Sequence, residues 1–140
     1  MGSSKGGTCA IYYGLKIGAT DIYAAACQYH IGEYLNTDNH QRIFKEMMGS
    51  GAGEKEQAVL DNEMPRMLQK KQGSKSTIHL LYSKDEHTYD EHIKDLIMDM
   101  DKHGIRHVDT IKSFADHAEV GRFFSPWIQE ELTKTINQNG

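Results

Sequence analysis

Long apolar runs and positively charged stripes are both missing from this sequence. Of its 140 residues, 38% are hydrophobic, and the formal net charge is −4. No segment approaches the roughly 18–20 consecutive apolar residues of a membrane helix, so no membrane span is expected. The mild negative charge, without basic residues interleaved with aromatics, gives no reason to expect a nucleic-acid partner. Length and composition predict one globular domain.

Cysteine and metal-ligand patterns are equally scarce. Cys9 and Cys27 are the two cysteines, and both lie in otherwise apolar stretches, which predicts buried free thiols in a reducing, cytoplasmic compartment. Eight histidines are present, but no CxxC or HExxH motif is. His103 and His107 are separated by Gly104 and a predicted helix end, and GSGAG lacks the Lys-Ser/Thr of a phosphate-binding loop. We therefore expect no metal and no cofactor.

Helical and strand-like segments alternate along the chain. Small or apolar residues on both faces predict buried strands over 21–27 and 77–82, and alternation predicts a third over 106–114. Apolar spacing predicts helices over 8–17, 41–48, 54–71, 89–104 and the second part of 117–136. The helix over 8–17 has apolar residues on most of its sides, which predicts that it is buried. Residues 28–41 read as a loop, Pro65 marks a kink or restart, and Pro126 suits a first helical turn. The fold class predicted is α/β, with about three parallel strands and flanking helices.

The opening residues contain a G-x-S-x-G motif, Gly2-Ser3-Ser4-Lys5-Gly6. In a nucleophile elbow the serine occupies a sharp, strained turn between strand and helix, and the residues two positions away must be small. The backbone N–H of Lys5 would then lie at a helix N-terminus, where it can stabilise an oxyanion. The alternative is a cloning scar, but a scar more often precedes a flexible polar segment than a helix.

An acid and a histidine follow in the chain order that such a site requires. The segment after the strand 77–82 offers Asp85 and Glu86, and the segment after the strand 106–114 offers His117. Open α/β sheets place their sites at these strand ends, so Ser4, one of the two acids and His117 are the candidate catalytic residues. Glu86 lies three residues after Ser83, which is the usual G-x-x-D spacing with Ser83 in the place of the glycine. Asp85 does not have this spacing, but aspartate is the residue type more often used as the acid. Helix capping or simple solvation is the alternative role of these side chains.

The long connection over 28–71 suits a cap inserted above the site. Tyr29 and His30 follow the strand 21–27 directly and are candidates for substrate binding, although ordinary loop positions are as common. Met47 and Met64 suit either a core or an acyl pocket beneath the cap.

The stretch 2–35, together with DEHTYDEHI and DHAEVGRFF, resembles α/β-hydrolase-fold serine esterases and acyltransferases. The likeness is to bacterial capsular-polysaccharide-biosynthesis hydrolase-like proteins and, more distantly, to the glycan O-acetyltransferase of the accessory Sec system. It covers the C-terminal half of their catalytic domain. It implies that Ser4 is the nucleophile, Glu86 or Asp85 the orienting acid and His117 the general base, acting on a small-molecule or glycan acyl ester.

The elbow strand and the loop that supplies a second oxyanion donor are not evident in this sequence. Residues 1–140 are therefore expected to form a single partial α/β-hydrolase domain, weakly active or inactive alone, that self-associates through an exposed sheet edge. The alternative function is a non-catalytic binding or assembly partner in glycan or glycoprotein export with a relic triad.

Overall fold

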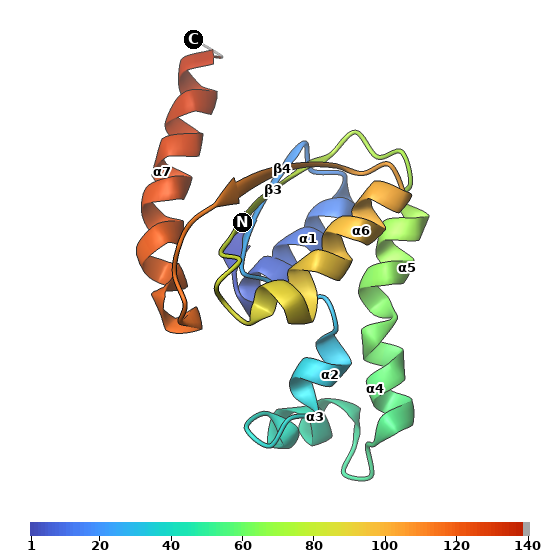
Figure 1. Ribbon diagram of the computed structural model, residues 1–140. Coiled ribbons are helices and arrows are strands. Elements are labelled where there is room, and N and C mark those ends of the chain that lie inside the picture. The colour runs from blue at the N-terminus through green and yellow to red at the C-terminus, as the bar shows by residue number, and fades with distance from the viewer. Residues whose placement is uncertain (139–140) are drawn as a thin grey trace.

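Four parallel strands form the centre of the computed structural model, which describes residues 1–138 (Figure 1). Their order in the sheet is β1-β2-β3-β4, and they span Gly2–Ser3, Asp21–Ala25, Thr77–Tyr82 and Arg106–Ile111. The predicted α/β class with a parallel sheet is confirmed. The sheet has four strands rather than about three because Gly2 and Ser3 pair with Ala24 and Ala25 of β2.

The two faces of the sheet are covered by different helices. On one face lie α1 (Lys5–Ile17), α5 (Glu63–Lys70) and α6 (Lys94–Lys102), which pack on alternate strand residues such as Ile22 and Leu80. On the other face α7 (Val120–Gln138) packs through Trp127 and Ile128 on Tyr23, Ala25 and Leu81. Side chains alternate between the faces of each strand, so the two sets form separate cores.

The connection between β2 and β3 is made of short helices joined by turns. It contains α2 (Ile31–Leu35), α3 (Gln41–Met48), α4 (Glu54–Asp61) and α5, and in Figure 1 α2, α3 and α4 lie beyond one end of the sheet. The predicted loop over 28–41 is therefore wrong in part. Gly32 of α2 contacts α4 so closely that a Cβ there would lie 2.1 Å from the Gln57 carbonyl oxygen. The helix predicted over 54–71 restarts at Glu63, after Asn62, which places Pro65 in its first turn.

The N-terminal helix is buried on one side only. Ile11 and Leu15 are fully buried, whereas Tyr13 is 58% and Ile17 80% exposed. Cys9 is exposed, so the expectation of a buried thiol is wrong for Cys9; it is correct for Cys27, whose pKa burial raises to about 12. Cys9 and Tyr13 are four residues apart and share the face of α1 that points away from the sheet.

The C-terminal helix begins earlier than its proline suggests. Asp116 caps a single 3₁₀ turn over His117–Glu119 by accepting a hydrogen bond from the Ala118 N–H at 2.9 Å, and α7 follows from Val120. Pro126 is therefore inside the helix, and the prediction that it occupies a first turn is wrong. Among the helices of residues 1–138, none combines the length and the apolar character of a membrane span.

Candidate active site

The segments that follow the four strands converge at one edge of the sheet. Ser4 follows β1, Gln28 follows β2, Glu86 follows β3, and His117 lies on the segment after β4. Because the strands are parallel, their carboxyl ends lie at the same end of the sheet, and this is where open α/β sheets hold their ligands.

Ser4 occupies a sharp turn between β1 and α1. Its φ is 51° and its ψ −130°, a left-handed conformation that is strained for a residue with a Cβ. The turn is held on both sides, since the Ser4 N–H donates to the Ala25 carbonyl at 2.8 Å and the Ser4 carbonyl accepts from the Gly7 N–H at 2.8 Å. Lys5 is the first residue of α1, so its N–H belongs to the positive end of the helix.

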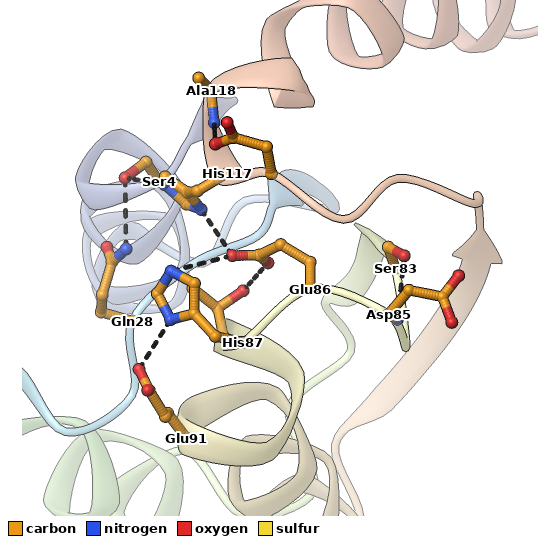
Figure 2. A network of polar contacts seen from close by, with 11 residues as sticks. Ser4, Gln28, Ser83, Asp85, Glu86, His87, Glu91, His117 and Ala118 are labelled. Atoms are coloured by element: carbon orange, nitrogen blue, oxygen red, sulfur yellow. Dashed lines mark hydrogen bonds and ion pairs between the residues drawn. The ribbon is translucent and has the colours of Figure 1, made fainter.

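Ser4, His117 and Glu86 form a chain of hydrogen bonds (Figure 2). Ser4 Oγ lies 2.8 Å from His117 Nε2, and His117 Nδ1 lies 3.1 Å from Glu86 Oε1. In the arrangement with a neutral imidazole, Nδ1–H donates to the carboxylate and Nε2 accepts the serine proton. The structure thus brings together the serine predicted from its G-x-S-x-G motif and the acid and histidine predicted from their positions after strands.

The Glu86 carboxylate is buried and held by several donors. Its other oxygen, Oε2, accepts a hydrogen bond from the Thr88 hydroxyl, and His87 Nε2 lies 3.3 Å from Oε1. Burial acts to raise the pKa of Glu86, but the hydrogen bonds from His117 and Thr88 outweigh it and leave this pKa below its ordinary value. Glu86 is therefore ionised at neutral pH.

The hydrogen bond that His117 donates to the Glu86 carboxylate raises the pKa of the imidazole above its ordinary value, against the smaller opposing effect of burial. A carboxylate that favours the imidazolium makes the ring a stronger base. A proton taken from Ser4 would thus be held better at His117 than at an isolated histidine.

Asp85 points away from this chain of contacts (Figure 2). Its Oδ2 accepts a hydrogen bond from Ser113 Oγ at 3.1 Å, and its side chain is exposed. Of the two acids left open by the sequence, Glu86 is the one that contacts His117.

Gln28 is a residue of the site that sequence reasoning missed. Its amide nitrogen donates to Ser4 Oγ at 3.2 Å, and its backbone exchanges hydrogen bonds with the Thr8 hydroxyl at 2.8 and 3.0 Å. Its Oε1 is buried and has no hydrogen-bond partner among residues 1–138. Its position directly after a central strand was the one available signal, and a lone glutamine forms no recognisable motif.

Tyr29 and His30 point elsewhere. Tyr29 is buried, and its hydroxyl donates to Asp99 of α6 at 2.8 Å; burial raises its pKa. His30 Nε2 contacts Asp95 Oδ2 at 2.8 Å, and its backbone N–H donates to His92 Nδ1 at 3.4 Å. Both side chains thus join the connection after β2 to α6. Within residues 1–138, neither makes a hydrogen bond to Ser4 or His117.

Gly2 and Gly7 are the positions of the turn at which only a small residue fits. A Cβ at Gly2 would lie 2.2 Å from the Gly6 carbonyl oxygen, and one at Gly7 would lie 3.0 Å from Cys27 Cβ. A Cβ at Gly6 would meet nothing within 4 Å. The expectation that Gly6 must be small is therefore wrong, because its α-hydrogens face open space at the surface of α1.

A hollow of about 340 Å³ lies beside the first turns of α1. Lys5 and Thr8 line it from α1, Leu35 from α2, Met47 from α3 and Met64 from α5, and its lining is mostly apolar. Met47 is 59% exposed, whereas Met64 is almost completely buried.

The molecule is thus an α/β protein in which a serine on a strand-to-helix turn contacts an imidazole that is paired with a buried carboxylate. No protein-family model and no curated protein matches the sequence.

Similar architecture occurs in solved structures of the capsule O-acetyltransferase of Neisseria meningitidis serogroup A. One of them superposes with a TM-score of 0.75 at 19% identity, over 94% of this chain and 55% of that chain. The complex with caged gadolinium superposes with a TM-score of 0.76 at 22% identity, over 98% of this chain and 54% of that chain. A mutant form in complex with CoA superposes with a TM-score of 0.73 at 19% identity, over 91% of this chain and 53% of that chain. The chain spans about half the length of these neighbours, and the likeness is one of fold.

Proposed function

We propose that this chain is the serine-bearing part of an α/β-hydrolase-type acyltransferase that O-acylates a bacterial surface polysaccharide. Residues 1–140 would form one partial domain, with 28–71 as a cap over the substrate. The observation that carries the proposal is the contact of Ser4 Oγ with His117 Nε2 at 2.8 Å, since the same ring is paired through Nδ1 with the buried Glu86. The fold of a capsule O-acetyltransferase supports the reaction class.

In the first half-reaction Ser4 Oγ forms a bond to the acyl carbonyl carbon while His117 Nε2 takes the hydroxyl proton. Glu86 holds the ring in the required tautomer and stabilises the imidazolium. The oxyanion would be stabilised by the Lys5 N–H at the start of α1. Collapse of the intermediate breaks the bond to the leaving group, which takes the proton from His117, and leaves an acyl-serine.

In the second half-reaction a sugar hydroxyl attacks the acyl-serine. His117 takes the hydroxyl proton and returns it to Ser4 Oγ, so atoms and charge balance over the cycle. Because a structural neighbour is a complex with CoA, we propose an acyl thioester of CoA as the donor. Attack by water instead of a sugar hydroxyl would make the same site an esterase.

The apolar hollow beside α1 would bind an apolar part of a substrate. Lys5, the residue after Ser4, lines it together with Met47 and Met64. Methionine side chains adapt to ligands of irregular shape, and α2–α4 would form the cap on this side.

Reaction with a fluorophosphonate probe tests the nucleophile. We expect the 140-residue chain to be labelled, with the adduct located on Ser4 by mass spectrometry, and Ser4→Ala to remove it. Ser3→Ala is the matched control, because it deletes the hydroxyl of the neighbouring serine, and it should remain labelled.

Labelling that survives in Ser4→Ala would overturn the assignment. The probe requires a reactive serine but not turnover, so it tests Ser4 even in a chain that is weakly active or inactive alone. A folded wild-type chain that stays unlabelled after long incubation would overturn the assignment, in favour of the alternative function in which the chain is a non-catalytic binding or assembly partner.

A further inference from the structure

Two imidazole rings meet the same oxygen of the buried carboxylate. His117 Nδ1 lies 3.1 Å from Glu86 Oε1, and His87 Nε2 lies 3.3 Å from the same oxygen (Figure 2). The three ligand atoms that these residues offer lie within 4.8 Å of one another. His87 has no part in the proposed acyl transfer, so its position needs another explanation.

Two of the three separations among these atoms match the spacing of ligands around a zinc ion. Zinc binds histidine nitrogen and carboxylate oxygen at about 2.0–2.1 Å in a tetrahedron, whose ligand atoms are then about 3.3 Å apart. The two separations at Glu86 Oε1 are 3.1 and 3.3 Å. An ion between the three atoms would take the place of the hydrogen through which His117 Nδ1 now contacts this oxygen. The side chain of His87 is 60% exposed, which gives the ion access from solvent.

Outer hydrogen bonds orient these ligands as they do in metal sites. His87 Nδ1 lies 2.9 Å from Glu91 Oε2, so its N–H can donate there and leave the Nε2 lone pair directed at Glu86. The second Glu86 oxygen is held by Thr88. A histidine whose far nitrogen is fixed by a carboxylate is the usual arrangement behind a metal ligand.

We propose that Glu86, His87 and His117 form a binding site for Zn²⁺ that inhibits the enzyme. The inhibition rests on the proposed function, whereas the binding does not. An ion on Nδ1 of His117 requires the lone pair there, so the neutral ring carries its proton on Nε2. That nitrogen then donates to Ser4 Oγ and cannot accept the serine proton, and the ion also takes the Glu86 oxygen that orients the ring.

Calorimetric titration of the 140-residue chain with ZnCl₂ tests the binding. We expect one site that His87→Asn weakens by at least about tenfold and Glu91→Gln by about tenfold, the lower range for loss of an outer partner. Replacement of Zn²⁺ by Co²⁺ should give the visible absorption of a four-coordinate ion, which His87→Asn removes. His87 is exposed, and circular dichroism will verify that the variant folds.

His107→Asn is the matched control. His107 also lies between two carboxylates, with its ring nitrogens 2.9 Å from Asp109 and 3.1 Å from Asp101, but it is on β4. We expect its zinc affinity to equal that of the wild type. Affinity that is unchanged in His87→Asn, or that falls in His107→Asn instead, would overturn the proposal.

Probe labelling separates this proposal from the proposed function. Zinc should slow the labelling of Ser4 in the wild type, EDTA should restore it, and His87→Asn should need at least about tenfold more zinc relative to its own metal-free rate. Zinc binding that depends on His87 in a chain that the probe never labels would support the site and overturn the proposed function. Labelling that saturating zinc leaves unchanged would overturn the inhibition.

Discussion

The oxygen of Ser4 lies between a base and a hydrogen-bond donor. His117 Nε2 is placed to accept its proton, and the Gln28 amide nitrogen donates to it from 3.2 Å. A donor on the nucleophilic oxygen stabilises negative charge as the proton leaves. The other end of the same amide, Oε1, is buried without a partner among residues 1–138.

The role of Gln28 can be tested by removing its amide. We expect Gln28→Leu, which nearly preserves volume, to lower the rate constant of fluorophosphonate labelling by about tenfold, the equivalent of one hydrogen bond of about 1.4 kcal/mol. Gln69→Leu, at an exposed position of α5, is the control and should react at the wild-type rate. Equal rates for the two variants would show that the Gln28 amide does not act on Ser4.

The pH dependence of labelling reports the Glu86–His117 pair. His117 acts as a base only when neutral, and its hydrogen bond to the Glu86 carboxylate raises its pKa above the ordinary value of about 6.5. Labelling should therefore rise with pH through a midpoint above about 6.5. Glu86→Gln removes the charge, so we expect the midpoint to move to lower pH and the plateau to fall by at least about a hundredfold.

Asp85→Asn is the neighbouring control for this measurement, since Asp85 accepts from Ser113 and not from His117. Its midpoint should match that of the wild type. A midpoint that moves in Asp85→Asn and stays in place in Glu86→Gln would contradict the pairing.

At the scale of elements, the turn between β1 and α1 depends on one close backbone approach. A Cβ on Gly2 would lie 2.2 Å from the carbonyl oxygen of Gly6, whereas a Cβ on Gly6 would lie in open space. We expect Gly2→Ala to push the turn open and to reduce labelling of Ser4 by more than about tenfold, a loss of about 1.4 kcal/mol.

Gly6→Ala is the matched control for the turn. Alanine is favoured over glycine in a helix by up to about 1 kcal/mol, so this variant should label at the wild-type rate and melt at the same or a higher temperature. Thermal unfolding and the labelling rate, measured side by side, distinguish the two. Equal labelling of both variants would show that the turn tolerates a side chain at Gly2.

Elements with local signals could be predicted from the sequence, and elements made by tertiary contact could not. The strand Thr77–Tyr82 and the helix Gln41–Met48 have the predicted bounds, because apolar runs end there at polar or glycine residues. The five-residue helix α2 was missed, since it contains Gly32 and is stabilised by close packing against Gln57 of α4. No local sequence pattern predicts the contact between Gly32 and Gln57.

The site follows the same division. The G-x-S-x-G motif predicts Ser4, and chain order with strand ends predicts the segments that carry Glu86 and His117, because the carboxyl ends of parallel strands lie together. The choice between Asp85 and Glu86 stayed open, since adjacent residues of a turn point in different directions and only three-dimensional structure shows which faces the ring.

At the scale of the whole molecule, the two edges of the sheet differ in character. β4 forms one edge and carries charged or ionisable residues at Arg106, His107 and Asp109, which discourage edge-to-edge pairing. At the other edge β1 covers only Ala24 and Ala25 of β2. The rest of β2, residues 21–23, extends beyond the register of β1, so its outward backbone groups face no strand within the described residues.

We therefore predict that the 140-residue chain self-associates through the β1–β2 edge. Light scattering after size exclusion should show dimers that form as concentration rises, and hydrogen exchange should show amides of residues 21–23 gaining protection while those of β4 do not. Val108→Lys is the control for association through side chains, because Val108 of β4 is 50% exposed; it should leave the dimer unchanged. A chain that stays monomeric at every concentration, or protection that appears along β4 instead, would show that the unpaired backbone groups of residues 21–23 do not drive association.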